Sequence, residues 1–225
     1  MNYDLMNNNK LSLTGRIASP VLFTHEVLGE SFFETTIEVK RLSGVSDVIP
    51  LTVSDRLMDE RPIAEGEEVT IEGQFRSHNK TEGDRSRLML TAFARDVIRP
   101  ALEGVDPNSL EVCGYICKPP VYRVTPFNRE ICDILLAVNR AYNKSDYIPC
   151  ILWGRSARYA KDLKVGTKVS MKGRVQSRCY NKTVDGGEVE ERVAYEFSVN
   201  RFKVEEHVAE HDHAALGVQS TAKLF

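Results

Sequence analysis

Residues 166–177, Gly-Thr-Lys-Val-Ser-Met-Lys-Gly-Arg-Val-Gln-Ser, decide the fold because apolar and polar side chains alternate along them. Val169, Met171 and Val175 fall on one face, and Lys168, Lys172 and Arg174 fall on the other. A period of two is typical of a β-strand with one buried face and one face in water. The stretch therefore predicts a strand whose exposed face is basic.

The same pattern occurs earlier in the chain at a shift of 100 residues, where residues 66–77 read Gly-Glu-Glu-Val-Thr-Ile-Glu-Gly-Gln-Phe-Arg-Ser. The pentapeptide Ser-Asp-Val-Ile-Pro at 46–50 returns as Ser-Asp-Tyr-Ile-Pro at 145–149, and Gly15 returns as Gly114. Three collinear matches indicate a tandem duplication. We expect one domain over residues 1–99, a linker over 100–107, a second domain over 108–206 and a flexible tail over 207–225, because Pro100, Gly104 and Pro107 suit a linker.

Each copy reads mainly as strands. In the second copy, alternating runs at 110–116, 131–140, 147–153 and 193–204 accompany the quoted strand, and a small apolar helical face at 155–163 precedes it. Three strands, a short helix and two strands are the order of the OB-fold. The expected fold class is all-β, with two tandem five-stranded Greek-key barrels that each carry one short helix between strands 3 and 4. Pro50 and Pro149 lie inside the third strand, so we expect a β-bulge there in both copies.

The composition fits a folded protein that works in water. Of 225 residues, 42% are hydrophobic and 28% charged, which is the ordinary mix of a globular protein. No apolar run approaches the roughly 18 residues of a membrane span, and the start has no signal-peptide pattern. We therefore expect a cytoplasmic protein with no membrane partner.

Charge is distributed unevenly along the chain. Residues 1–107 hold 12 Lys and Arg against 18 Asp and Glu, which gives −6, whereas residues 108–206 hold 17 against 12, which gives +5. Residues 207–225 add −1, and the three parts sum to the net charge of −2. A basic half points to a polyanionic partner.

The sequence gives little support for a metal site or a catalytic site. The five cysteines are an odd number in a chain without an export signal, so we expect reduced thiols. Cys113 and Cys117 lack a second pair at zinc-site spacing, and the tail histidines His207, His211 and His213 are more simply solvated than metal-binding. No nucleophile elbow, phosphate-binding glycine loop or zinc-protease motif occurs. We expect neither a cofactor nor an enzymatic activity.

Four segments of the second copy carry a family resemblance. They are Cys-Gly-Tyr-Ile-Cys-Lys-Pro-Pro-Val-Tyr-Arg-Val-Thr-Pro at 113–126, Leu-Ala-Val-Asn-Arg at 136–140, Asp-Tyr-Ile-Pro-Cys-Ile-Leu-Trp-Gly-Arg-Ser-Ala at 146–157, and Lys-Gly-Arg-Val-Gln-Ser-Arg-Cys-Tyr at 172–180. In order and spacing, over residues 110–204, they resemble the bacterial single-stranded DNA-binding protein family, of which primosomal replication protein N is a close relative. The resemblance implies sequence-tolerant binding and protection of single-stranded DNA in replication, recombination or repair.

The resemblance also implies which side chains contact DNA. A protein that holds any single strand needs cations for phosphates and flat side chains for bases. The family's stacking positions correspond to Tyr142, Tyr147, Trp153 and Tyr180. Six cations are candidates for phosphate contacts, of which the last three could equally be solvated loop charges: Lys172, Arg174, Arg178, Arg123, Arg140 and Arg155.

The first copy differs at the corresponding positions. Glu68, Glu72 and Gln74 stand where the second copy has Lys168, Lys172 and Arg174, and Val48 and Ser54 stand where it has Tyr147 and Trp153. We therefore expect an acidic, structural first domain without stacking platforms. Because single-domain members of the family commonly form tetramers, two domains per chain imply a homodimer that carries four.

The end of the chain departs from the family. Phe225 is aromatic, as the family's last residue is, but Lys223 stands where acidic residues are expected. Docking of replication or repair proteins by that route therefore does not follow from the resemblance. Two other functions remain open from the sequence: a primosome-like accessory protein, and a protein-protein scaffold that kept the fold without DNA binding.

Overall fold

The computed structural model describes residues 7–41, 43–83, 85–183 and 189–205. The predicted tail at 207–225, with its histidines, Lys223 and Phe225, lies outside the described residues. The first half of the chain forms β1 (Asn9–Ile17), β2 (Leu22–Val27), β3 (Glu30–Lys40), β4 (Ser46–Ser54), α1 (Asp55–Glu60), β5 (Glu68–Glu82) and β6 (Arg85–Ile98). The second half forms β7 (Asn108–Ile116), β8 (Val121–Val124), β9 (Glu130–Asn139), β10 (Ser145–Trp153), α2 (Gly154–Ala160), β11 (Lys168–Thr183) and β12 (Val189–Val204).

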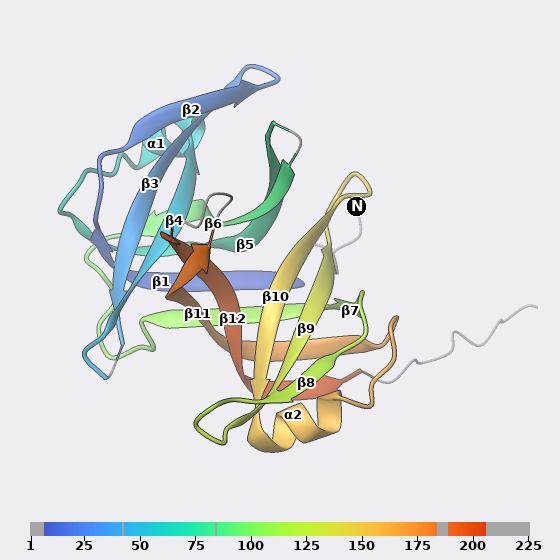
Figure 1. Cartoon of the computed structure of the whole chain (residues 1–225). Helices are drawn as coiled ribbons and strands as arrows, with labels where there is room; N and C mark the ends of the chain where they lie inside the picture. Colours follow the sequence, from blue (N-terminus) through green and yellow to red (C-terminus); the bar gives the residue numbers. More distant parts are fainter. Residues whose placement is uncertain (1–6, 42, 84, 184–188, 206–225) are drawn as a thin grey trace, which may run out of the picture.

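The two halves are joined by strand pairing. Strands β1 and β7 run antiparallel with Leu11 opposite Leu110, and they lie side by side across the middle of the molecule (Figure 1). The described strands form one sheet in the order β2-β3-β4-β6-β5-β1-β7-β11-β12-β10-β9-β8. Helices α1 and α2 lie at opposite ends of the molecule (Figure 1). Among the described residues, no helix is both long and apolar enough to cross a membrane.

The expected tandem OB-fold is confirmed, and each half adds one strand that the sequence did not predict. Helices α1 and α2 follow β4 and β10 as expected, although α2 spans Gly154–Ala160 and not residues 155–163. The additional strands, β2 and β8, pair only with β3 and β9. Strand β8 has four residues, none of them buried, so the alternation of buried and exposed side chains that predicts a strand is missing there.

The predicted bulge at the prolines is wrong. Pro50 lies directly opposite Thr36, and Pro149 lies opposite Leu135, without a change of register. On the other edge of each strand, parallel pairing begins only one residue later, at Leu51 in β4. The missing N–H of proline is tolerated there because that part of the edge has no partner strand.

The register changes instead at the glycine of the repeated motif. Strand β11 shifts against β12 between Lys172 and Gly173, and β5 shifts against β6 at the matching position. A Cβ atom on Gly173 would lie 2.0 Å from the carbonyl oxygen of Ser198. This approach of two backbones requires glycine, which explains why the residue is kept in both copies.

A repeated asparagine fixes the first strand of each barrel. The Asn108 side chain donates to the Val175 carbonyl at 2.7 Å and accepts from the Val175 N–H at 2.9 Å. Asn9 makes the same pair of bonds with Phe75, at 2.8 and 3.0 Å. Both asparagines are buried, so each satisfies two backbone groups that would otherwise lose water without a replacement.

A repeated aspartate joins the two halves. Asp47 accepts a hydrogen bond from the Ser177 N–H at 2.8 Å, and Asp146 accepts one from the Ser77 N–H at 2.7 Å. Both aspartate residues are fully buried. The Ser-Asp pairs that revealed the duplication therefore form two related contacts across the junction.

Candidate nucleic-acid interface

Strand β10 places two of the predicted aromatic residues on the outside of the second barrel. Ile148, Cys150 and Leu152 alternate into the core, so Tyr147 and Trp153 face away from it. Tyr147 is 44% exposed and Trp153 is 37% exposed. We call this side of β10, β11 and β12 the outer face.

Trp153 and Arg174 lie near one another on the outer face. The Trp153 Nε1–H donates to the Ser198 hydroxyl oxygen at 3.2 Å. Ser198 is the register partner of Ile151 on β10 and of Arg174 on β11. Because neighbouring strands are about 4.8 Å apart, the exposed Arg174 is one strand away from the serine that holds the indole. In the part of the chain that the structure describes, no ion pair involves Arg174.

Strand β11 brings a second cation and aromatic together further along the same face. The Arg178 guanidinium carbon lies 5.8 Å from the centre of the Tyr180 ring. Arg178 is exposed, and Tyr180 is partly exposed. This distance suits a cation–π contact, so the pair offers a base-stacking surface beside a positive charge.

The loop before β10 presents Tyr142. Its side chain is 92% exposed and its φ is +60°, which few residues other than glycine adopt. Tyr147 is held at the junction, because its backbone N–H donates to the Ser77 hydroxyl of the first half at 2.7 Å. The four predicted aromatic residues therefore all have exposed surface, but they extend from the loop to the β11 hairpin and do not form one cluster.

Five of the six predicted cations, the arginines, fall into two groups. Arg174, Arg155 and Arg178 are exposed, and within the described ranges none of them is ion-paired. Arg123 pairs with Asp133 at 2.6 Å, and Arg140 lies 3.4 Å from Asp146. Exposed ion pairs contribute little stability, so a phosphate can compete for Arg123 more easily than for Arg140, whose partner is fully buried.

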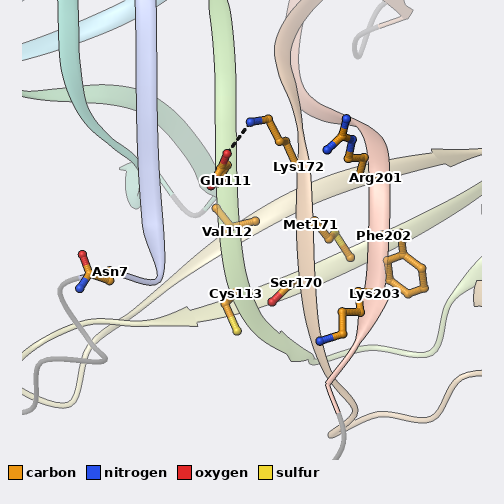
Figure 2. Close-up of a pocket in the computed structure, with 10 residues that line it drawn as sticks. All are labelled: Asn7, Glu111, Val112, Cys113, Ser170, Met171, Lys172, Arg201, Phe202 and Lys203. Carbon is orange, nitrogen blue, oxygen red and sulfur yellow. Dashed lines mark hydrogen bonds and ion pairs between the residues drawn. The ribbon is translucent and has the colours of Figure 1, made fainter.

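Lys172 does not lie beside the aromatic residues. Its Nζ is 2.5 Å from Glu111 Oε1, at the point where β11 pairs with β7. Figure 2 shows it in a pocket with Arg201 and Lys203, on the side of β11 that precedes the Gly173 irregularity. The pocket is basic, but a DNA strand that contacted Lys172 there would run apart from Trp153.

The expectation that the first domain lacks an aromatic platform is wrong. Thr52 pairs with Phe93 in the first barrel just as Ile151 pairs with Ser198 in the second. The first domain therefore has a phenylalanine at the place where the second has the serine that contacts Trp153. Sequence comparison of β4 with β10 misses this residue, and alignment of β6 with β12 at a shift of 105 residues would have found it.

The serine at the position of Trp153 has a structural role. The Ser54 side chain is the N-cap of α1 and accepts from the Leu57 N–H at 3.5 Å. Trp153 occupies the N-cap position of α2 and makes no side-chain capping bond there. The second domain thus has an aromatic residue where the first has a helix cap.

The cysteines form no metal site within the described part of the chain. The five cysteines are free, and burial raises the pKa of the Cys132 thiol to about 11. Such a thiol stays protonated near neutral pH. The described residues contain no group of histidine, cysteine and carboxylate side chains able to hold a metal ion.

The second half of the chain is similar to known proteins. Residues 107–204 match the Single-strand binding protein family. Single-stranded DNA-binding protein 1 of Lactococcus lactis is 32% identical over a stretch that covers 32% of this chain and 53% of that protein. The single-stranded DNA-binding protein of Bacillus cereus is 34% identical and covers 32% and 47%. The matches span about half the length of these relatives.

A solved structure resembles the whole chain. The wild-type single-stranded DNA binding protein from Thermus aquaticus superposes with a TM-score of 0.68, covers 96% of both chains and is 15% identical. At that identity the likeness shows a shared fold. It extends over both barrels, whereas the family match is confined to the second.

Proposed function

We propose, from the match of residues 107–204 to the Single-strand binding protein family, that the protein binds and protects single-stranded DNA with little sequence preference. It would do so in replication, recombination or repair, as a binding protein without catalytic activity. The observation that supports this most directly is the outer face of the second domain. There, Trp153, Arg174 and the Arg178–Tyr180 pair combine stacking surfaces with cations that form no ion pair among the described residues.

The chemistry of this face suits a single strand better than a duplex. Base stacking on an aromatic side chain contributes about 1–3 kcal/mol per base and tolerates any base. A duplex hides the faces of its bases, so only its phosphates could use this surface. Arg174 and Arg155 would bind phosphates, and Trp153 and Tyr147 would stack bases at the two ends of β10.

A salt titration tests the function. Poly-dT should bind more tightly than duplex DNA of the same length, and the logarithm of its affinity should fall with the logarithm of salt concentration by about 0.7 per phosphate contact. Trp153 is the sole tryptophan, so its fluorescence should change on saturation. Equal affinity for duplex, an affinity insensitive to salt, or unchanged fluorescence would refute the proposal.

We further propose a homodimer that carries four OB domains. Within one chain, the β1–β7 pairing and the reciprocal aspartate contacts already join two barrels as a pseudo-symmetric pair. Two such pairs give an assembly of about 51 kDa, twice the chain mass of 25.4 kDa. Light scattering at micromolar concentration that shows a 25 kDa monomer would exclude it. A protein of this function would work in the cytoplasm on nucleoid DNA, where its partners are single strands and its own second copy.

A further inference from the structure

Three aromatic rings gather on the outside of the first barrel. The Phe93 and Phe32 ring centres lie 6.1 Å apart at an angle of 46°, and His25 stacks on Phe32 at 5.1 Å and 18°. Phe32 lies opposite the small Ser54 in the β3–β4 ladder. His25 is exposed and both phenylalanines are partly exposed, so this cluster offers ring surface to a ligand.

Two arginines meet at the same place. The Arg76 guanidinium carbon lies 3.6 Å from the centre of the Phe93 ring. Arg76 and Arg95 both donate to the side-chain oxygen of Gln74, at 3.0 and 3.1 Å. Gln74 lies opposite Phe93 in the β5–β6 ladder. One neutral amide therefore holds two guanidinium groups, of which that of Arg76 lies against an aromatic ring.

The charge of this group is not neutralised. Over the described residues, neither Arg76 nor Arg95 forms an ion pair with a carboxylate. Burial, followed by the positive charges of Arg140 and Arg95, lowers the pKa of Arg76 to about 10, and Asp146 opposes this only in part. Mutual repulsion between cations is relieved when an anion binds.

A surface pocket of about 480 Å³ opens at these side chains. Arg56 of α1 adds a third cation, and Glu30 and Glu60 add two carboxylates, so the pocket keeps a net positive charge. Its lining residues include Arg56, Arg76, Arg95, Phe93, Glu30 and Glu60. The first domain is acidic as a whole, but this part of it is not.

The cluster adjoins the interface of the second domain. Ser77 follows Arg76 in the chain and accepts the backbone hydrogen bond of Tyr147 at 2.7 Å. Tyr147 is itself one of the proposed base-stacking residues. A DNA strand that leaves the outer face past Tyr147 would therefore reach Arg76 next and Phe93 after it.

We infer that the first domain holds a second contact for the same single strand, in which Arg76 and Arg95 bind a phosphate and the Phe93–Phe32–His25 cluster stacks bases. The inference rests on the proposed function of the second domain. It replaces the expectation that the first domain is purely structural. In the second domain the stacking Trp153 ends β10, whereas in the first domain Phe93 lies on β6, the neighbour of the matching strand β4. Arg76 lies on β5, which matches the β11 strand of Arg174, and Arg95 lies on β6.

Oligonucleotide length separates the two contacts. An OB-fold covers about 4–16 nucleotides, so dT of about 8 nucleotides should quench Trp153 fluorescence equally in the wild type, Phe93→Leu and Arg76→Gln. Labelled dT of about 30 nucleotides should bind Phe93→Leu about 5- to 150-fold more weakly, the effect of losing one stacked base. It should also bind Arg76→Gln more weakly, with a salt slope smaller by about 0.7, the effect of losing one phosphate contact. Arg16→Gln is the matched control, because it removes a cation from the same domain on β1, where Arg16 pairs with Glu38.

The outcomes distinguish the two proposals. If the long oligonucleotide binds both variants as tightly as the wild type, the first-domain contact is refuted while the proposed function stands. If the wild type binds neither oligonucleotide, both are refuted. A loss in Arg16→Gln as large as that in Arg76→Gln would mean that net charge alone acts, and would refute a built site. Thermal unfolding of each variant excludes misfolding as the cause.

Discussion

The two aspartates of the domain junction occupy matching sequence positions and should respond differently to the same substitution. Asp47 accepts two hydrogen bonds from Arg41, at 2.6 and 2.5 Å, besides the Ser177 N–H. Asp146 accepts from the Ser77 N–H, but its Oδ2 has no hydrogen-bond partner in the described structure and is met only by the Arg140 Nε at 3.4 Å. An asparagine side-chain oxygen can still accept the serine N–H hydrogen bond in both places. The comparison of the two variants therefore reports the contribution of the other carboxylate oxygen.

The expected magnitudes follow from these contacts. In Asp47→Asn the amide faces Arg41 with a donor or a neutral oxygen, and two charge-assisted hydrogen bonds of about 1.5 kcal/mol each are lost. We expect about 3 kcal/mol less stability, or a Tm lower by about 6–12 °C in a chain of this size. Asp146→Asn loses no hydrogen bond; it breaks the longer 3.4 Å ion pair with Arg140 and removes a buried charge, so its loss of stability at pH 7 should be smaller than that of Asp47→Asn.

The dependence on pH should also have opposite signs. Burial tends to raise the pKa of Asp47, but Arg41 and the Ser177 N–H outweigh it and hold this pKa below its ordinary value. Its contribution is therefore present above about pH 3.9 and is lost as the pH falls through the lower folded value. Burial raises the pKa of Asp146. Its contribution is present below about pH 3.9 and is lost as the pH rises through the folded value.

Urea unfolding of the two variants and the wild type, at pH 7 and on acidification, measures both effects. The deficit of Asp47→Asn should shrink below about pH 3.9, and any gain of Asp146→Asn should be largest at neutral pH. Equal losses in the two variants at pH 7, or a larger loss in Asp146→Asn, would refute the assignment of the structural charge pair to the first domain.

Four other substitutions give direct tests. Trp153→Ala should weaken poly-dT binding by about 1–3 kcal/mol, measured with a labelled oligonucleotide; an unchanged affinity would contradict stacking at this residue. Ser54→Ala should lower the unfolding free energy by about 1 kcal/mol through loss of the α1 cap, measured by urea unfolding. Lys172→Gln should weaken DNA binding less than Arg174→Gln, because Lys172 is already paired with Glu111. If salt titrations show the larger loss of affinity in Lys172→Gln, the DNA runs through the pocket of Figure 2.

The duplication, five of the six strands in the second half and the position of the helices after β4 and β10 could be predicted from the sequence. The alternation around Val169 and the repeated glycines are local patterns, because a strand with one buried face has apolar and polar residues in alternation along its sequence. Trp153 and Tyr147 could also be placed on an exposed face, since Ile148, Cys150 and Leu152 alternate with them.

Which side chains stand beside one another was decided only by the tertiary structure. Phe93 and Ser54 lie on strands that are far apart in sequence, and it is the parallel β4–β6 register that brings the aromatic residue to the neighbouring strand. Lys172 shares its strand face with Arg174, but the irregularity at Gly173 and the pairing with β7 separate their surroundings. Composition made the first domain acidic on average, whereas the cationic site at Arg76 depends on neighbours from both halves of the chain. Periodicity is a property of one strand, but a binding surface is a property of several, and their register is fixed by packing that a single strand does not encode.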